Sequence, residues 1–412
     1  MTTHVFALFL LTNLLACLSL AFPTKRQAGQ VGVLDVSIPP NRNDDQYYTV
    51  DIDFDGQTIP VLIDTGSGDL FAGSNQCSTT DPTSGCYLSS VYQISNDTVI
   101  VANETFGTVV GVAGVNGNQS IMTVDFGGIA VPDLATREFQ NGSFGGIFGL
   151  SPRNLSRNYY FFERLPPVDA MITEGLLEEP LFSLTLPRLG DPGSTSGKLT
   201  FGAIEDVATI GEISYNEVID TPNYGYPDAP LATQSWTSQL IGLRLNGVEI
   251  NLTESSIDAQ GRYISLLDSG AQSILLRYQE FTAAAALFAG PTIVQDGFAV
   301  YFDCATPQLL ELKFADHDDD DRWFAVDPLD LIIPSAHPVI NGTQMCRAAL
   351  GTWNGVFADA ILGVPFMRNV VGVFDYGTAD LYSVQPRVGL GSLTDGGKAV
   401  ARYEGLYRDR LQ

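Results

Sequence analysis

The sequence predicts an all-β protein built as two related lobes with a cleft between them. Short apolar stretches alternate with glycine-containing turns, and 41 glycines accompany few long amphipathic runs, a pattern typical of β architecture. A chain of 412 residues with 45% apolar residues is long enough for two domains. A pair of motifs also occurs twice in the same order, and this duplication is the better reason to expect two lobes.

The first motif of the pair is a strand that runs into an acidic turn. Residues 61–67 read Val-Leu-Ile-Asp-Thr-Gly-Ser, and residues 265–271 read Ser-Leu-Leu-Asp-Ser-Gly-Ala. Three strand-forming residues followed by an acid, a small hydroxyl residue and a glycine indicate a buried strand ending in a tight turn. Each turn therefore presents one carboxylate, Asp64 in the first copy and Asp268 in the second.

The second motif is an apolar strand that ends in glycine. It occupies residues 146–150 and 360–364, so that Gly149 follows Asp64 by 85 residues and Gly363 follows Asp268 by 95. One acidic turn alone could equally be a solvated strand end. Two copies, each followed by the same kind of strand at a similar distance, favour a catalytic pair of carboxylates, which could act as general acid and general base.

The arrangement resembles the pepsin-like aspartic endopeptidases, secreted enzymes of which the fungal type is the best match. The similarity runs from about Tyr47 to about Tyr382. Residues 64–71 resemble the first catalytic loop of that family, 360–369 with 373–375 its near-terminal signature, and 181–184 and 198–202 the strands that close its first lobe. The resemblance implies a bilobal acid protease fold with two six-stranded-barrel-type lobes, and one catalytic aspartate in each.

The resemblance also assigns roles within the two turns. Asp64 and Asp268 would form a dyad that shares one proton, as in aspartic proteases generally. The residues expected to support the two loops are Thr65, Gly66, Ser67, Ser269 and Gly270. Ser67 fills a position whose hydroxyl bonds to the neighbouring aspartate in the family. The second loop has Ala271 there, so Asp268 is expected to lack this outer hydrogen bond.

A second departure concerns the flap, the hairpin that covers the cleft in this family. The family's Tyr-Gly-Thr corresponds best to Phe106, Gly107 and Thr108, and the tryptophan that bonds the flap tyrosine corresponds to Phe71. The tyrosine hydroxyl and the tryptophan ring N–H are therefore both missing, which predicts an apolar contact between Phe71 and Phe106 instead. Misalignment of this region is the alternative.

Several local elements can also be predicted. Residues 47–54 and 58–63 alternate as the two strands of an opening hairpin around Asp55-Gly56. Helices are expected near 168–175 and, in an alanine-rich stretch, over 279–290, and a strand over 236–240. The predicted organisation is a signal peptide (1–21), a short propeptide ending in the dibasic pair Lys25-Arg26 (22–26), an N-terminal lobe (27–210), a C-terminal lobe (211–385) and a polar C-terminal extension (386–412).

Cysteines and sequons agree with a secreted chain. Without the signal peptide four cysteines remain, which permit three pairings; the resemblance favours Cys77 with Cys86 and Cys304 with Cys346. Metal binding is the disfavoured alternative, because the paired Cys-x-x-Cys spacing is absent. The acceptor sites for glycosylation are Asn96, Asn103, Asn118, Asn141, Asn154, Asn251 and Asn341.

Charge and missing motifs narrow the function further. A formal net charge of −26 repels nucleic acid and anionic membranes. A serine hydrolase would need Gly-x-Ser-x-Gly, and a zinc peptidase His-Glu-x-x-His; the sequence has neither. We therefore expect a secreted, extracellular, monomeric endopeptidase that acts on proteins or peptides at acidic pH, without cofactor or metal, between large apolar residues. The alternative is a pepsin-like binding or inhibitor protein with weak or no activity.

Overall fold

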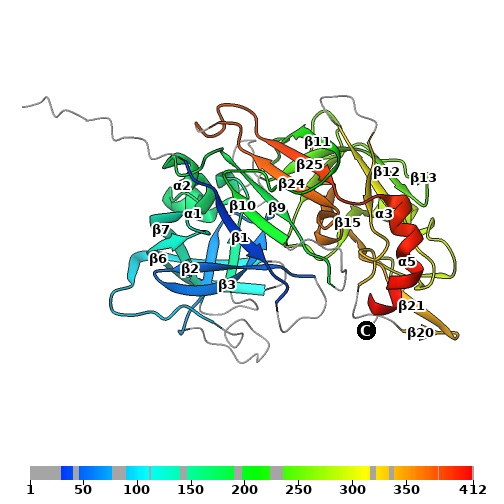
Figure 1. The fold of residues 1–412 in the computed structure, drawn as a ribbon, viewed down its shortest axis with the longest axis horizontal. Helices are drawn as coiled ribbons and strands as arrows, with labels where there is room; N and C mark the ends of the chain where they lie inside the picture. Colours follow the sequence, from blue (N-terminus) through cyan, green and yellow to red (C-terminus); the bar gives the residue numbers. More distant parts are fainter. Residues whose placement is uncertain are drawn as a thin grey trace, which may run out of the picture.

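The computed structural model describes residues 29–39, 46–76, 90–110, 113–139, 146–189, 197–222, 235–315, 322–333, 338–378 and 380–410. Figure 1 shows two β-rich halves side by side, the first half of the chain in blue to green and the second in green to red. The predicted signal peptide, the dibasic pair, Cys77, Cys86 and Asn141 lie outside the described residues.

The described residues of the first half form a seven-stranded sheet. In sheet order its strands are β2 (Thr49–Phe54), β3 (Gln57–Asp64), β8 (Gly146–Gly149), β4 (Leu70–Gly73), β7 (Ala130–Phe139), β6 (Ala113–Asp125) and β5 (Val99–Val110). The predicted opening hairpin is confirmed as β2 and β3. Asp55 and Gly56 adopt φ angles of 49° and 82°, the left-handed pair that a two-residue hairpin turn requires.

The second half contains two further sheets within the described ranges. The first has the order β19 (Phe324–Val326), β18 (Leu310–Phe314), β12 (Thr237–Leu245), β14 (Ile264–Leu267), β23 (Ala360–Leu362), β15 (Ile274–Arg277) and β22 (Leu350–Trp353), with β13 (Val248–Glu249) paired to β12. The other has the order β16 (Thr292–Gln295), β17 (Ala299–Asp303), β21 (Thr343–Arg347) and β20 (Val339–Ile340).

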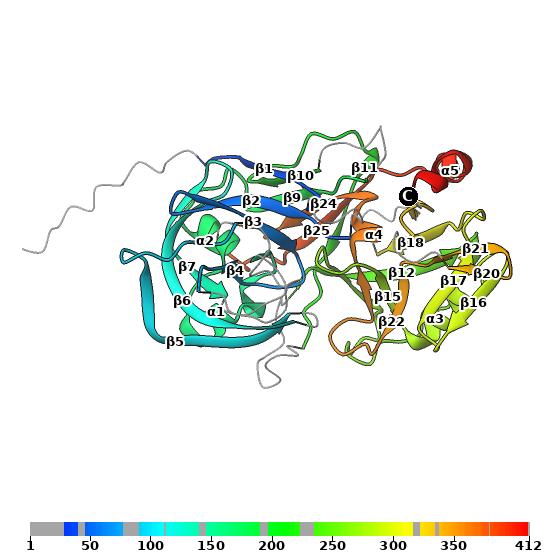
Figure 2. The same ribbon diagram turned by 90° about the horizontal axis from the view of Figure 1, so that it is seen from below.

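A six-stranded sheet joins the two halves (Figure 2). Its order is β1 (Gly32–Val36), β10 (Gly197–Phe201), β9 (Leu181–Thr185), β24 (Val370–Asp375), β25 (Arg387–Ser392) and β11 (Ile210–Glu217). The halves meet where β9 pairs with β24. Phe182 stacks on Phe374 there with ring centroids 4.6 Å apart, and the buried Trp236 packs edge-on against both rings. This aromatic layer fixes how the two halves sit against each other.

Short helices cover the sheets. They are α1 (Arg157–Phe162), α2 (Pro167–Thr173), α3 (Tyr278–Ala285) and α4 (Val364–Met367), with a 3-10 turn, η2, at Arg153–Leu155. Both predicted helices are therefore confirmed, although α3 ends five residues earlier than expected. No helix in the described part of the chain is both long and apolar enough to span a membrane.

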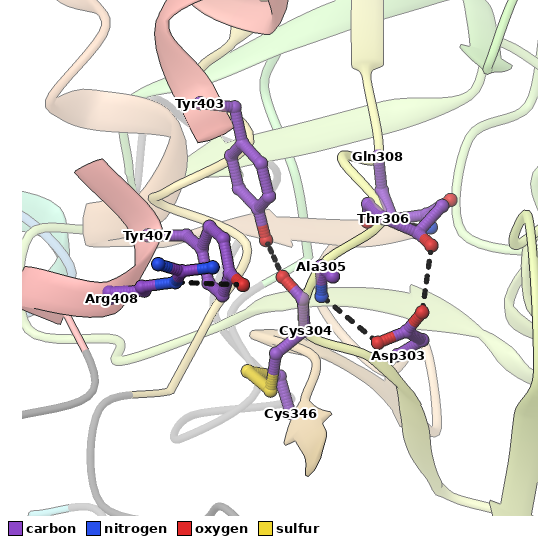
Figure 3. Close-up of a disulfide and its surroundings, with 9 residues drawn as sticks. All are labelled: Asp303, Cys304, Ala305, Thr306, Gln308, Cys346, Tyr403, Tyr407 and Arg408. Carbon is purple, nitrogen blue, oxygen red and sulfur yellow. Dashed lines mark hydrogen bonds between the residues drawn. A yellow bond between two sulfur atoms is a disulfide. The ribbon is translucent and has the colours of Figure 1, made fainter. Parts of the chain in front are cut away.

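The C-terminal residues differ from the polar extension predicted for 386–412. Residues Arg387–Ser392 are β25, inside the shared sheet, and Gly396–Arg410 form the helix α5, which packs on the second half (Figures 1 and 3). Ala399 and Tyr403, four residues apart, are buried, and the Tyr403 hydroxyl donates to the Cys304 carbonyl at 2.8 Å. Among the α5 residues whose side chains the structure describes, only this narrow stripe is buried. The polar composition of this segment suggested that it is solvated, but the four-residue spacing of Ala399 and Tyr403 lets one face of the helix pack on the second half.

The disulfide predicted between Cys304 and Cys346 is present. Cys304 directly follows β17 and Cys346 lies in the neighbouring strand β21, with their Cα atoms 5.0 Å apart. Figure 3 shows the bond below Tyr403 of α5. The disulfide therefore closes a 42-residue separation within the second half, at the place where the C-terminal helix docks.

Candidate active site

The two acidic turns end equivalent strands in the two halves. Asp64 is the last residue of β3, and Asp268 directly follows β14. Each of these strands runs parallel to the apolar strand of the second motif, since β3 pairs with β8 and β14 with β23. The repeated motif pair in the sequence is thus a repeated pair of neighbouring strands.

The glycine that ends the second motif is present in both halves for a steric reason. A Cβ atom placed on Gly149 would lie 2.5 Å from the backbone nitrogen of Asp69, and one on Gly363 would lie 2.3 Å from the carbonyl oxygen of Ala271. Both distances are far below van der Waals contact. Glycine is therefore required in each half for the strand to approach the loop that carries the acid.

Hydrogen bonds between Thr65 and Ser269 join the two acidic loops. The Thr65 hydroxyl donates to the Leu267 carbonyl at 2.9 Å and accepts from the Ser269 backbone N–H at 2.9 Å. The Ser269 hydroxyl donates to the Ile63 carbonyl and accepts from the Thr65 backbone N–H, both at 3.0 Å. Both residues are buried, so the network is shielded from water and fixes one loop against the other.

The two carboxyl groups face each other across this network. A Cβ on Gly66 would lie 2.6 Å from the Asp268 carboxyl carbon, and a Cβ on Gly270 would lie 2.6 Å from Asp64 Oδ1. Each carboxyl thus occupies the space above the glycine of the opposite loop. Any larger residue at either glycine would push the two carboxyl groups apart.

The hydrogen bonds to the two acids are unequal. Asp64 Oδ2 accepts from the Ser67 hydroxyl at 2.6 Å, and Asp64 Oδ1 accepts from the Gly66 N–H at 2.9 Å. Asp268 accepts the corresponding N–H bond from Gly270 at 2.9 Å, but Ala271 has no hydroxyl to offer. The asymmetry expected from the sequence is therefore present.

Burial and mutual repulsion set the protonation of the pair. Burial, followed by the negative charge of Asp64, raises the pKa of Asp268 to about 8. Burial also raises the pKa of Asp64, but the bonds from Ser67 and Gly66 act against that rise. Two carboxyl groups held close together cannot both ionise cheaply, and the unequal bonds favour Asp268 as the protonated member and Asp64 as the ionised one.

Three further residues, which the sequence analysis did not identify, hold the first acidic loop from behind. The Ser151 hydroxyl donates to the Thr65 carbonyl at 2.6 Å. Asp69, 4% exposed, accepts from the Ser156 hydroxyl at 2.6 Å and from the Arg157 and Asn158 N–H groups at the start of α1. A serine such as Ser156 is a typical helix N-cap, which could have indicated the start of α1. No local sequence pattern indicated that Ser156 would bond to Asp69.

The predicted flap residues lie in two different strands. Phe71 is in β4 and is 2% exposed, whereas Phe106 and the exposed Gly107 are in β5, which forms a long hairpin with β6. The Phe106 side chain lies outside the described part of the structure. The contact between Phe71 and Phe106 therefore stays a prediction.

The candidate glycosylation sites differ in accessibility. Exposed positions are Asn96, Asn103, Asn251 and Asn341, and half-buried ones are Asn118 and Asn154. Asn103 and Asn341 also adopt left-handed backbone angles, with φ of 67° and 52°.

Across the described ranges, no group of three or more His, Cys, Asp or Glu side chains could hold a metal ion.

Comparison with known proteins places this geometry in a family. The model of the eukaryotic aspartyl protease family matches residues 46–384. A probable aspartic-type endopeptidase of Aspergillus fumigatus is 25% identical over 366 residues, covering 81% of this chain and 77% of the relative. Cathepsin D of Dictyostelium discoideum is 27% identical, covering 81% and 82%, and pepsin II-1 of Oryctolagus cuniculus is 25% identical, covering 81% and 79%. The chain, with its duplicated acidic turns, belongs to the eukaryotic aspartyl proteases.

Proposed function

We propose that Asp64 and Asp268 are the catalytic dyad of a secreted endopeptidase that cleaves proteins or peptides at acidic pH. The observation that carries this proposal is the hydrogen-bonded pair of loops, in which each carboxyl lies against the glycine of the other loop. Family membership supports peptidase activity, and the comparisons do not favour the alternative of a binding or inhibitor protein.

In the proposed mechanism one water molecule lies between the two carboxyl groups. Ionised Asp64 takes a proton from the water while the water oxygen bonds to the carbonyl carbon of the peptide. In the same step Asp268 gives its proton to the carbonyl oxygen. The product of this step is a neutral tetrahedral gem-diol. Asp64, now protonated, then passes its proton to the amide nitrogen while Asp268 takes one from a hydroxyl. The C–N bond breaks, and the dyad returns to its starting protonation.

The setting proposed for this activity follows from the sequence. The predicted signal peptide, the disulfide in the second half and the exposed sequons support export and glycosylation. We propose a monomer that prefers large apolar residues on both sides of the scissile bond, as its family does. The net charge of −26 argues against nucleic acid and anionic membranes as partners.

Digestion of unfolded haemoglobin between pH 3 and 7 tests the proposal, with the secreted protein compared with its Asp64→Asn and Asp268→Asn variants. We expect activity on the acid side of this range, lost in both variants, while circular dichroism shows that both remain folded. A folded and processed parent without activity at any pH would instead support the binding-protein alternative. Activity that survives in either variant would exclude the dyad.

A further inference from the structure

A buried cluster of charged side chains joins the two halves of the chain. Arg188, three residues after β9, donates from Nε to Asp330 Oδ1 at 2.9 Å and from Nη2 to Asp330 Oδ2 at 2.6 Å. Arg368, directly after α4, forms an ion pair with the same carboxylate, with its Nε 2.9 Å from Oδ1. The side chain of Asp330 is 0% exposed. One acid of the second half is therefore held by an arginine from each half.

The cluster is connected to both acidic loops. Nη1 of Arg368 donates to the Tyr48 hydroxyl at 3.3 Å. The Tyr48 carbonyl accepts, at 3.0 Å, the N–H of Ile63, which directly precedes the first acid of the dyad. In the other half, α4 begins at Val364, whose N–H donates to the carbonyl of Ala271 in the second acidic loop at 2.8 Å. Arg368 is thus linked through short contacts to the backbone beside each acid.

The C-terminal helix supplies a further cation to this cluster. Arg402 of α5 donates from Nη2 to Oδ2 of Asp327, which is 0% exposed and directly follows β19. Within the described part of the chain, the other cation near this carboxylate is Arg188, whose Nη1 lies 3.9 Å from the same oxygen. The match to the aspartyl protease family ends at residue 384. A helix beyond that match therefore neutralises a buried acid of the cluster.

This arrangement makes the position of Arg188 depend on Arg402. Arg188 lies between two buried carboxylates, with Nη2 2.6 Å from Asp330 and Nη1 3.9 Å from Asp327. A buried carboxylate that loses its cation is strongly destabilised. Without Arg402, Asp327 would draw Arg188 away from Asp330. Asp330 would then draw Arg368 closer, and the bond that connects Arg368 to the strand before the first acid would weaken.

We propose that Arg402 is a positioning residue for the dyad. Its charge neutralises Asp327, which leaves Arg188 bound to Asp330 and keeps the two acidic loops at their spacing. The helix α5 thereby contributes to the geometry of the site from the far end of the chain. The effect on catalysis rests on the proposed function, whereas the effect on the two loops does not.

Hydrogen exchange of backbone amides, measured by mass spectrometry, tests the placement of the loops. In Arg402→Met, peptides covering residues 58–66 and 362–368 contain the amides beside the two acids, and they should exchange about threefold faster or more. Peptides from β7, in the sheet of the first half, should exchange as in the parent. Faster exchange in β7 as well would show a general loss of stability and would overturn the inference.

Two variants of the same helix are the controls. Arg408→Met also removes an arginine from α5, but Arg408 is exposed and lies against Tyr407 (Figure 3). Tyr403→Phe removes the bond by which α5 docks on the Cys304 carbonyl and leaves Arg402 in place. Both variants should keep the parent's exchange in the two peptides beside the acids, because neither removes the charge that neutralises Asp327.

Two further variants test the role of the charge. Arg402→Lys keeps a cation on α5 but offers a single point charge in place of the planar guanidinium, and it should recover most of the parent's protection from exchange. The double variant Arg402→Met with Asp327→Asn removes the carboxylate that would draw Arg188. It should therefore exchange more slowly than Arg402→Met in both peptides. A double variant no better protected than the single one would overturn the inference.

Peptidase activity gives the second measurement. In Arg402→Met, kcat should fall by about tenfold while KM stays within about twofold, since a displacement of about 1 Å at the reacting groups can cost about 100-fold in rate. The double variant should recover kcat together with its protection. Unchanged exchange in Arg402→Met would overturn the inference. If that variant does not fold, the double variant decides: it should fold with the parent's exchange, and its failure to do so would overturn the inference. An inactive parent would refute the proposed function but leave the exchange result valid.

Discussion

Replacing Ser67 with alanine should shift the acid limb of the pH profile upward. The Ser67 hydroxyl donates a 2.6 Å bond to Asp64 Oδ2, and this bond stabilises the ionised carboxylate. A hydrogen bond to a charged group contributes about 1.5–3 kcal/mol, and 1.36 kcal/mol corresponds to about one pKa unit. The proposed mechanism needs an ionised Asp64 to activate water, so the pH at which kcat/KM reaches half its maximum on the acid side should rise by about one to two units.

The assay is kcat/KM for a quenched fluorescent peptide, measured from pH 2 to 8 on the parent and the variant. Ala271→Ser is the matched control, because it adds a hydroxyl at the equivalent position of the other loop. It should leave the acid limb in place and lower the pKa of Asp268, which moves the alkaline limb down. An unchanged acid limb in Ser67→Ala, with folding intact, would refute the reasoning that Asp64 is the ionised member.

Three further predictions concern stability. Thr65→Val leaves the Leu267 carbonyl and the Ser269 N–H buried without a hydrogen-bond partner. Urea unfolding should therefore show a free energy of unfolding lower by about 2–5 kcal/mol, and kcat should also fall. Replacing both Cys304 and Cys346 with alanine should cost about 4 kcal/mol for the 42-residue separation, measured in the same way. The melting temperature should fall as pH rises from 4 to 8. Folding raises the carboxyl pKa from 3.8 to about 7 for Asp169 and to about 8 for Asp268, so the stability that these groups contribute is complete below pH 3.8 and is lost as the pH rises to the folded pKa. Each such group loses up to about 1.4 kcal/mol per pH unit in this window, and a melting temperature that rises instead would contradict the assignment.

The site could be predicted from the sequence to the extent that its chemistry is local and repeated. Asp64 and Asp268 each end an apolar strand, and the strand beside each one carries the repeated glycine. The opening hairpin was predictable because Asp55-Gly56 suits a left-handed turn. The absence of a hydroxyl at Ala271 follows from the sequence alone, and so does its consequence for Asp268.

The remaining contacts join residues too far apart for a local pattern to indicate them. Asp69 reaches Ser156 across 87 positions, and Asp169 reaches Tyr382 across 213. An isolated acid in a sequence usually belongs to a solvated surface, and nothing near Asp169 indicated burial. The helix α5 was missed for a related reason, since a single buried stripe around Tyr403 is hidden among polar residues.

The proposed dyad is divided between two halves, so its geometry depends on how firmly those halves are joined. Three of the contacts that join the halves are the stacked rings of Phe182 and Phe374 in the shared sheet, the Thr65–Ser269 network, and the bond from Trp236 Nε1 to the Leu150 carbonyl at 2.8 Å. Leu150 itself donates its N–H to the backbone carbonyl of Asp64, so Leu150 links Trp236 of the second half to the backbone of the first acidic residue. A small error in carboxyl placement costs more in the transition state than in substrate binding. Changes at these joints should therefore lower kcat while leaving KM nearly constant, whereas changes in the flap should act mainly on KM.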